Sequence, residues 1–196
     1  MPLLCELKSN RIDDGMKALA EIESNKHRLK FTVYYARLLQ EFVEVSQEDQ
    51  KRLVHQVCTD CDDTCCRNVN CLHLSDVLKC WLGQEGSNFL PEFSKSAEIG
   101  TKEALENCAY LSPDGCIIHR KNRPLICIQY TCSKWDKIAN EKLLKLMKAS
   151  RAAMEDTVML YKIEAGQTDG MNLLEVKERL QSFEKMLNDY CTEVEK

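Results

Sequence analysis

Residues 58–66 read CTDCDDTCC, so four thiols occupy nine consecutive positions. Closely spaced cysteines serve disulfide knots, redox dithiols and metal centres. Adjacent Cys65 and Cys66 could form a disulfide only through a strained ring. Cys58 and Cys61 match the spacing of a redox pair, but that motif belongs to a strand-to-helix context, and the pattern before Cys58 is helical. We therefore interpret the stretch as a set of metal ligands. On a helix three of these cysteines share one face, with Cys66 roughly 100° away.

A second group of four cysteines lies between residues 108 and 132. The sequence SPDG at 112–115 favours a tight turn, and we expect a hairpin that returns Cys116 toward Cys108. Arg123-Pro124 predicts an extended step before another turn or a helix start. We expect the two groups to lie close together and to share a metal centre, with these candidate ligands: Cys58, Cys61, Cys65, Cys66, Cys108, Cys116, Cys127 and Cys132.

The donor chemistry limits the metal. Soft thiolates select zinc or an iron–sulfur cluster rather than magnesium or calcium, and four thiolates satisfy one tetrahedral zinc or one [4Fe–4S] cluster. The sequence leaves the choice between the two open. Either centre is anionic, so cations nearby would stabilise it, and an anion or substrate site is the alternative interpretation of 119–123. The candidate cations are Arg67, Arg120, Lys121 and Arg123, while His73 and His119 are ordinary side chains or replacement ligands.

Composition bears on the compartment and on the partners. The chain has 196 residues and twelve cysteines, which would indicate disulfides in a secreted protein. The first residues, MPLLCELKSNRIDD, lack the apolar run of a secretory signal, and no segment approaches the ~20 apolar residues of a membrane span. We therefore expect a reducing cytoplasm. The net charge of −4 argues against a nucleic-acid or membrane partner.

Apolar residues recur at helical spacing on both sides of the cysteine-rich middle. Residues 12–45 predict one long helix or two stacked helices, and Ser46 with Asp49 predicts an N-cap for a helix that runs from about residue 47 into Cys58. A helical pattern begins again at Trp135 and continues past Tyr161.

Two glycines in 164–170 predict a break before a last amphipathic helix. On that helix the spacing of Glu175 and Arg179 suits an ion pair. We interpret Cys5 and Cys191 as small hydrophobic residues outside the metal site.

These patterns together predict a mainly α fold. Long N- and C-terminal helices would surround a cysteine-rich metal-binding centre with short hairpin or turn elements. The chain divides into an N-terminal helical arm at 1–57, a metal-binding module at 58–132 and a C-terminal helical arm at 133–196, expected to form one compact domain. Ten of the twelve cysteines lie in the middle, which has few large apolar residues, so we expect its order to depend on the metal.

Several features of the middle segment occur together in a known family. They are the quartet at 58–66, Leu74-Ser75-Asp76-Val77 through Leu82-Gly83, Phe89-Leu90, and a closing signature of Cys108, Tyr110-Leu111, Gly115-Cys116, Ile118, Arg123-Pro124 and Cys127. With them the chain resembles the YkgJ-like family of zinc- or iron-chelating cysteine-cluster proteins, which includes flagellin N-methylase-like proteins. The departures are Asp62-Asp63-Thr64, His119, Ile128 and Thr131.

The resemblance implies metal chelation, and it implies an enzyme only weakly. Our first hypothesis is a metal- or cluster-binding protein whose site has a structural, sensory or electron-carrying role. Two other functions stay open. One is a cluster-dependent enzyme, methyltransferase-like or an oxidoreductase, although seven glycines and no βαβ alternation argue against a conventional methyltransferase. The other is an adaptor that zinc staples together and whose helical arms bind a protein partner.

Overall fold

A computed structural model describes residues 12–58, 77–79, 111–112, 115–116, 123, 125–129, 135–167 and 172–194. Helices dominate these residues, which confirms the predicted mainly α fold. The helices are α1 (Ile12–Asn25), α2 (Lys30–Val45), α3 (Gln47–Cys58), α6 (Leu125–Gln129), α7 (Trp135–Ile138), α8 (Glu141–Glu164) and α9 (Leu173–Val194), and the strands are β1 (Leu111–Ser112) and β2 (Gly115–Cys116).

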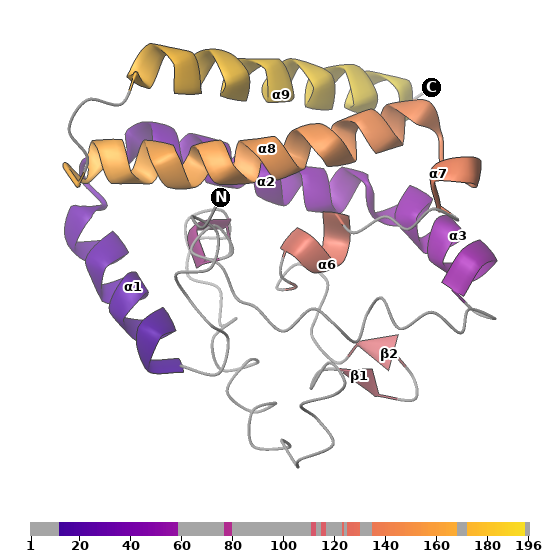
Figure 1. Cartoon of the computed structure of the whole chain (residues 1–196), viewed down its shortest axis with the longest axis horizontal. Coiled ribbons are helices and arrows are strands. Elements are labelled where there is room, and N and C mark those ends of the chain that lie inside the picture. Colours follow the sequence, from indigo (N-terminus) through magenta and orange to yellow (C-terminus); the bar gives the residue numbers. More distant parts are fainter. Residues whose placement is uncertain are drawn as a thin grey trace.

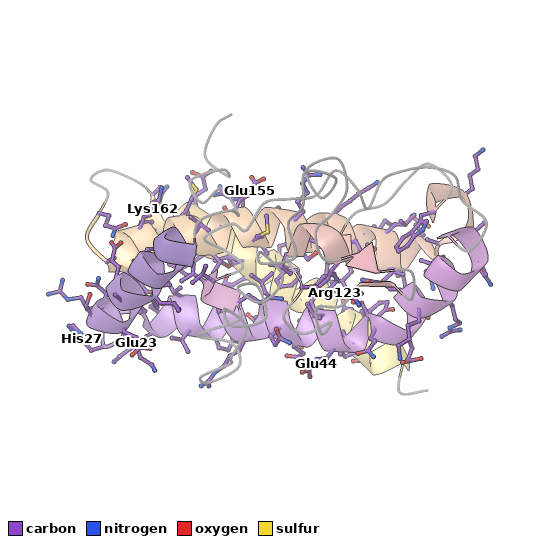
Figure 2. All side chains as sticks on the ribbon, turned by 90° about the horizontal axis from the view of Figure 1, so that it is seen from below. Glu23, His27, Glu44, Arg123, Glu155 and Lys162 are labelled. Atoms are coloured by element: carbon purple, nitrogen blue, oxygen red, sulfur yellow. The ribbon has the colours of Figure 1, made fainter. Side chains whose placement is uncertain are left out.

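Helices α2 and α8 lie side by side and form a central layer (Figure 1). Helix α9 packs along one side of this layer and contacts both helices. Helix α1, helix α6 and the β1–β2 hairpin lie on the other side, which faces the viewer in Figure 2. The layer therefore separates α9 from α6 and the hairpin, which carry two of the described cysteines of the predicted metal site.

A large part of the main hydrophobic core lies on the α9 side of the layer. Buried residues of α9 recur every three or four positions, which places them on one stripe toward α8 and α2. Phe183 of this stripe meets Phe42 of α2 edge to face, with ring centroids 6.5 Å apart. The buried residues of the stripe are Val176, Leu180, Phe183, Leu187 and Tyr190.

Residues 12–45 form two helices rather than one, separated by a turn at residues 26–29. Leu29 precedes α2 and makes no side-chain cap. The carboxylate of Glu164, at the end of α8, instead accepts the backbone N–H of Phe31 at 3.1 Å and that of Thr32 at 2.8 Å. The hydroxyl of Thr32 donates to the same carboxylate at 2.7 Å. A residue from the opposite arm thus caps the unsatisfied N–H groups of α2.

The start of α3 agrees with the prediction, but Ser46 does not act as the predicted N-cap. Its hydroxyl donates back to the carbonyl of Phe42 at 2.6 Å and accepts the side-chain amide of Gln50 at 3.0 Å. Asp49, the acidic residue of the expected cap, accepts from Arg52 at 2.7 Å and from the hydroxyl of Tyr190. The acidic residue therefore links α3 to α9.

The predicted continuous helix from Trp135 is wrong at one point, because α7 ends at Ile138 and α8 begins at Glu141. Asn140 makes this break: its side chain accepts the backbone N–H of Lys142 at 2.9 Å and caps α8. The predicted break at 164–170 agrees with the end of α8 at Glu164, and Gly166 there has φ 74°.

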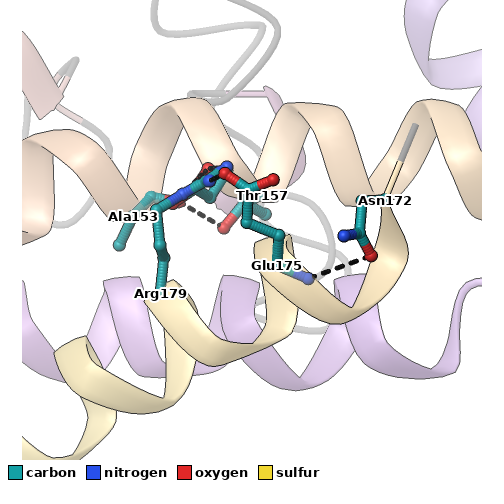
Figure 3. A network of polar contacts seen from close by, with 6 residues as sticks. Ala153, Thr157, Asn172, Glu175 and Arg179 are labelled. Atoms are coloured by element: carbon teal, nitrogen blue, oxygen red, sulfur yellow. Dashed lines mark hydrogen bonds and ion pairs between the residues drawn. The ribbon is translucent and has the colours of Figure 1, made fainter.

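The predicted ion pair of Glu175 and Arg179 is confirmed, with Nη1 and Oε1 2.7 Å apart. Arg179 also binds Asp156 of α8, with Nη2 and Oδ1 2.6 Å apart and Nε donating to both carboxylate oxygens at 3.0 Å. Figure 3 shows the side chain of Arg179 extending from α9 toward α8. The side chain of Asp156 is only 7% exposed. The buried partner in α8 was not predicted, and it makes Arg179 a link between the two longest helices.

Candidate metal centre

The described residues include the backbones of three of the eight predicted ligands. Cys58 is the last residue of α3, Cys116 belongs to β2 and Cys127 is the third residue of α6. The other predicted ligands lie outside the described residues, as do the two histidines considered as replacements: Cys61, Cys65, Cys66, Cys108, Cys132, His73 and His119.

The three described ligand positions belong to elements that share one side of the molecule. Helix α6 and the hairpin lie on the side of the α2–α8 layer opposite α9, and α3 runs from the end of α2 toward the same side (Figure 1). Two of these cysteines come from the second quartet and one from the first. The placement of these elements on one side of the layer is the observation that favours one metal centre shared by the two quartets.

The predicted hairpin is confirmed over its described residues. β1 pairs with β2 in antiparallel register, with Leu111 opposite Cys116 and Ser112 opposite Gly115. Two residues, Pro113-Asp114, connect the strands in the sequence, the length of the tightest β-hairpin loops. The hairpin turns the chain back immediately before Cys116, as the turn signal predicted.

Helix α6 begins directly after Pro124, where the sequence predicted a turn or a helix start. Leu125 is fully buried and Ile128 is 2% exposed, and both belong to the main core. Gln129 donates its side-chain amide to the hydroxyl of Ser150 in α8 at 3.0 Å. The short helix that carries Cys127 is thus attached to α8 by two apolar side chains and one hydrogen bond.

The sequence patterns did not predict that Lys79 is buried next to this helix. Residues 77–79 are helical and fully buried, within the helix that the family resemblance implied. The ammonium of Lys79 donates to the backbone carbonyl of Arg123 at 2.9 Å. Only the two apolar neighbours, Val77 and Leu78, hint in the sequence that this lysine enters the interior. Among the predicted compensating cations Arg123 is half-buried, and the others lie outside the described residues.

The donor set fits the predicted metals. Thiolates are the ligands that zinc and iron–sulfur clusters prefer. Among the side chains that the structure describes, no group of three or more His, Cys, Asp or Glu is arranged to hold a metal ion. The side chains of the two quartets, which carry the predicted ligands, lie outside the described ones.

Burial raises the pKa of Tyr35, and three further tyrosines have raised pKa values because they are buried or lie beside carboxylates. Burial and the carboxylate of Glu21 raise the pKa of Tyr161 to about 12. The hydrogen bond to Glu184 raises the pKa of exposed Tyr34 to about 12. Burial and then the bond to Asp49 raise the pKa of Tyr190 above its usual range. Each of these three phenols stays protonated at neutral pH and ties two helices together.

A pocket of about 410 Å³ lies between the start of α8 and the end of α9. Its wall combines two lysines, one carboxylate and the phenol of Tyr190, whose proton is directed to Asp49. This combination does not include a thiol or an imidazole, so we assign it no part in metal chemistry. The lining residues are Lys142, Lys145, Leu146, Met186, Asp189, Tyr190 and Thr192.

The chain matches no family model, and comparison with curated proteins and with solved structures finds no match. The resemblance to the cysteine-cluster family therefore depends on the residues quoted for it above. Within the described part of the chain, no helix is both long enough and apolar enough to span a bilayer. Cys191 is half-buried and packs against the main core, in keeping with its interpretation as a small hydrophobic residue.

Proposed function

We propose that this protein binds zinc or an iron–sulfur cluster in the cytoplasm through its two cysteine quartets, in a structural, sensory or electron-carrying role. The observation that carries the proposal is the common side of the α2–α8 layer shared by the three elements that hold Cys58, Cys116 and Cys127. Cysteines separated by up to 69 positions in the sequence belong to elements on one side of a helical scaffold. Clustered thiols of this kind serve metals in a reducing compartment.

The expected ligands are the eight cysteines of the two quartets, and not every one of them is required. Cys66 is the least secure, because its position on a continued helix is off the face shared by the rest of its quartet. When bound, zinc would hold these segments together, and an iron–sulfur cluster would in addition accept and release an electron. The protein would supply the thiolates and the buried cation of Lys79, which bonds to the carbonyl of Arg123 just before α6.

Metal analysis of protein purified without air tests the proposal. We expect stoichiometric zinc in colourless protein, or iron and sulfide in brown protein with broad absorption in the visible range. Cys116→Ser and Cys127→Ser should lower the metal content, whereas Cys191→Ser, a matched change in α9, should leave it unchanged. Full metal content in both quartet variants would contradict the second quartet as a ligand set, and wild-type protein without metal would contradict the function itself.

The proposal includes a protein partner bound through the helical arms and excludes nucleic acid, given the net charge of −4. Large exposed apolar side chains on the arms include Phe31 and Tyr34 of α2 and Leu174 of α9, at 46%, 44% and 65% exposure. Lys177 covers the ring of Phe31 at 3.5 Å, and Tyr34 donates to Glu184. A partner complex that forms equally well with Leu174→Ala and Phe31→Ala would contradict binding at this edge.

A further inference from the structure

The side of the α2–α8 layer opposite α9, which holds α6 and the β1–β2 hairpin, is called the cysteine side below. Helix α6 is attached there to α8 through described side chains. Leu125 and Ile128 are buried in the core against α8. Gln129 donates to Ser150, and Ser150, fully buried, donates onward to the carbonyl of Met147 at 2.8 Å. The contacts to α8 are therefore made by the protein itself and need no metal.

The helical register separates Cys127 from these contacts. At about 100° per residue, Gln129 is roughly 40° around the axis from Leu125, so both belong to the stripe that meets α8. The position of Cys127 is roughly 200° from Leu125, on the other half of the helix circumference. One short helix can therefore dock on α8 through one stripe while its cysteine position stays outside that stripe.

The approach to α6 is held by the buried lysine. Lys79 donates to the carbonyl of Arg123, two residues before the helix begins, and is itself 0% exposed. A buried ammonium is stable only where acceptors and negative charge compensate it. A thiolate centre on the same side of the layer is anionic, so it would be stabilised by this cation. Lys79 can thus serve both the geometry and the charge of the centre.

We propose that α6 is a preset support of the metal centre, docked on α8 before the metal binds, and that Lys79 and Gln129 are positioning residues for the ligand Cys127. Gln129 secures the end of the helix and Lys79 secures the segment that enters it. This inference rests on the proposed function, since it assigns these residues to the same metal site. It adds that one ligand is presented by an element whose order does not depend on the metal.

The two positioning residues are tested by the rate at which the protein loses metal to excess EDTA. This rate is measured without air, by metal analysis after desalting. Gln129→Met keeps the length of the side chain, Lys79→Met shortens it by only one atom, and both variants remove the polar group. We expect metal to be lost roughly 10–100-fold faster, the scale of outer-shell changes in metal affinity. The exposed residues Lys145 and Gln181 provide the matched controls Lys145→Met and Gln181→Met, which should behave as wild type. Ser150→Ala should reproduce the effect of Gln129→Met, and the double variant should add little.

Equal rates in the positioning variants and the controls would overturn their assignment while leaving the metal function intact. Hydrogen exchange of the EDTA-treated wild type tests the preset helix separately: amides of α6 should remain protected while those of the β1–β2 hairpin lose protection. Rapid exchange throughout α6 in the metal-free protein would overturn the preset support. Wild-type protein that never holds metal would overturn the proposed function itself, a result distinct from both.

Discussion

The two sides of the α2–α8 layer are held together in different ways. On one side α9 presents a continuous stripe of five buried residues along the length of the layer. On the other side, besides the longer helix α1, the described segments between α3 and α7 are short, and α6 contributes two core residues and a hydrogen bond to Ser150. Residues 77–79 add a lysine bond to a backbone carbonyl. Buried apolar surface stabilises the α9 side. A few individual contacts and, we propose, a bound metal stabilise the short segments of the opposite side.

This difference would explain why metal binding is confined to the side of the layer opposite α9. A long apolar interface tolerates the loss of a polar contact, because most of its free energy comes from buried area. Short segments cannot bury enough surface to order themselves and therefore need specific bonds or a metal. Under the proposed function, the scaffold on the α9 side would thus remain folded while thiolates on the other side bind or release the metal.

The largest effect is expected in the α9 interface. Phe183→Ala removes a 1%-exposed ring that packs against Phe42. We expect a loss of about 3–5 kcal/mol in the free energy of unfolding, measured by urea denaturation. Leu174→Ala on the same helix is the control, because a residue 65% exposed should change stability by less than about 0.5 kcal/mol. Similar losses in the two variants would contradict a core on this side.

The polar link between α8 and α9 should follow in magnitude. Arg179→Met leaves the carboxylate of Asp156, 7% exposed, without its ion pair. We expect a cost of about 1–3 kcal/mol for a buried charged group that loses its partner. Glu175→Gln removes only the outer member, 63% exposed, and should cost far less. Urea denaturation in low and moderate salt measures the unfolding free energy of both variants. An equal loss in the two variants would contradict a larger contribution from the buried pair of Arg179 with Asp156.

Alkaline pH should weaken the junction of α8 with α1. Tyr161 has a pKa of about 12 in the folded protein, against 10.0 for a tyrosine side chain in water, so the unfolded chain loses its proton first. The stability that depends on this proton is complete below pH 10.0 and is lost as pH rises to the folded value, by at most about 1.4 kcal/mol per pH unit. Tyr161→Phe should flatten the fall in unfolding free energy above pH 10.0. If the unfolding free energy of Tyr161→Phe fell with pH as steeply as that of the wild type, Tyr161 would not be the source of this pH dependence.

The smallest effect concerns the cap of α2. Glu164→Gln keeps an acceptor oxygen for the N–H groups of Phe31 and Thr32 but removes the negative charge at the helix start. We expect a loss of about 0.3–1 kcal/mol that shrinks in high salt. Thermal unfolding in low and high salt measures this change, and a salt-independent loss would indicate that the charge has no role.

Local patterns predicted the elements that local chemistry determines. The stripe of α9, the pair of Glu175 and Arg179, the hairpin after SPDG and the helix start after Pro124 all depend on residues near one another in the sequence. The cap of α2 could not be predicted this way, because Thr32 and Glu164 meet only after both arms fold.

The same limit applies to the candidate metal centre. The burial of Lys79 depends on its contact with Arg123, 44 residues further along the chain. The cysteine types and spacings indicate a donor set, but the relative placement of the two quartets depends on how the layer brings α3, the hairpin and α6 to one side. The break at Asn140 was also missed, since the apolar pattern continues across it and only the cap marks the boundary.

Limited proteolysis with and without EDTA, with every cut mapped by mass spectrometry, tests the difference between the two sides most directly. We predict that EDTA exposes new cuts between Cys58 and Arg123, while α2, α8 and α9 stay intact and α6 remains attached. Cys116→Ser should show the same new cuts without EDTA. A cleavage pattern that EDTA and Cys116→Ser both leave unchanged would contradict the claim that metal orders the cysteine side of this protein.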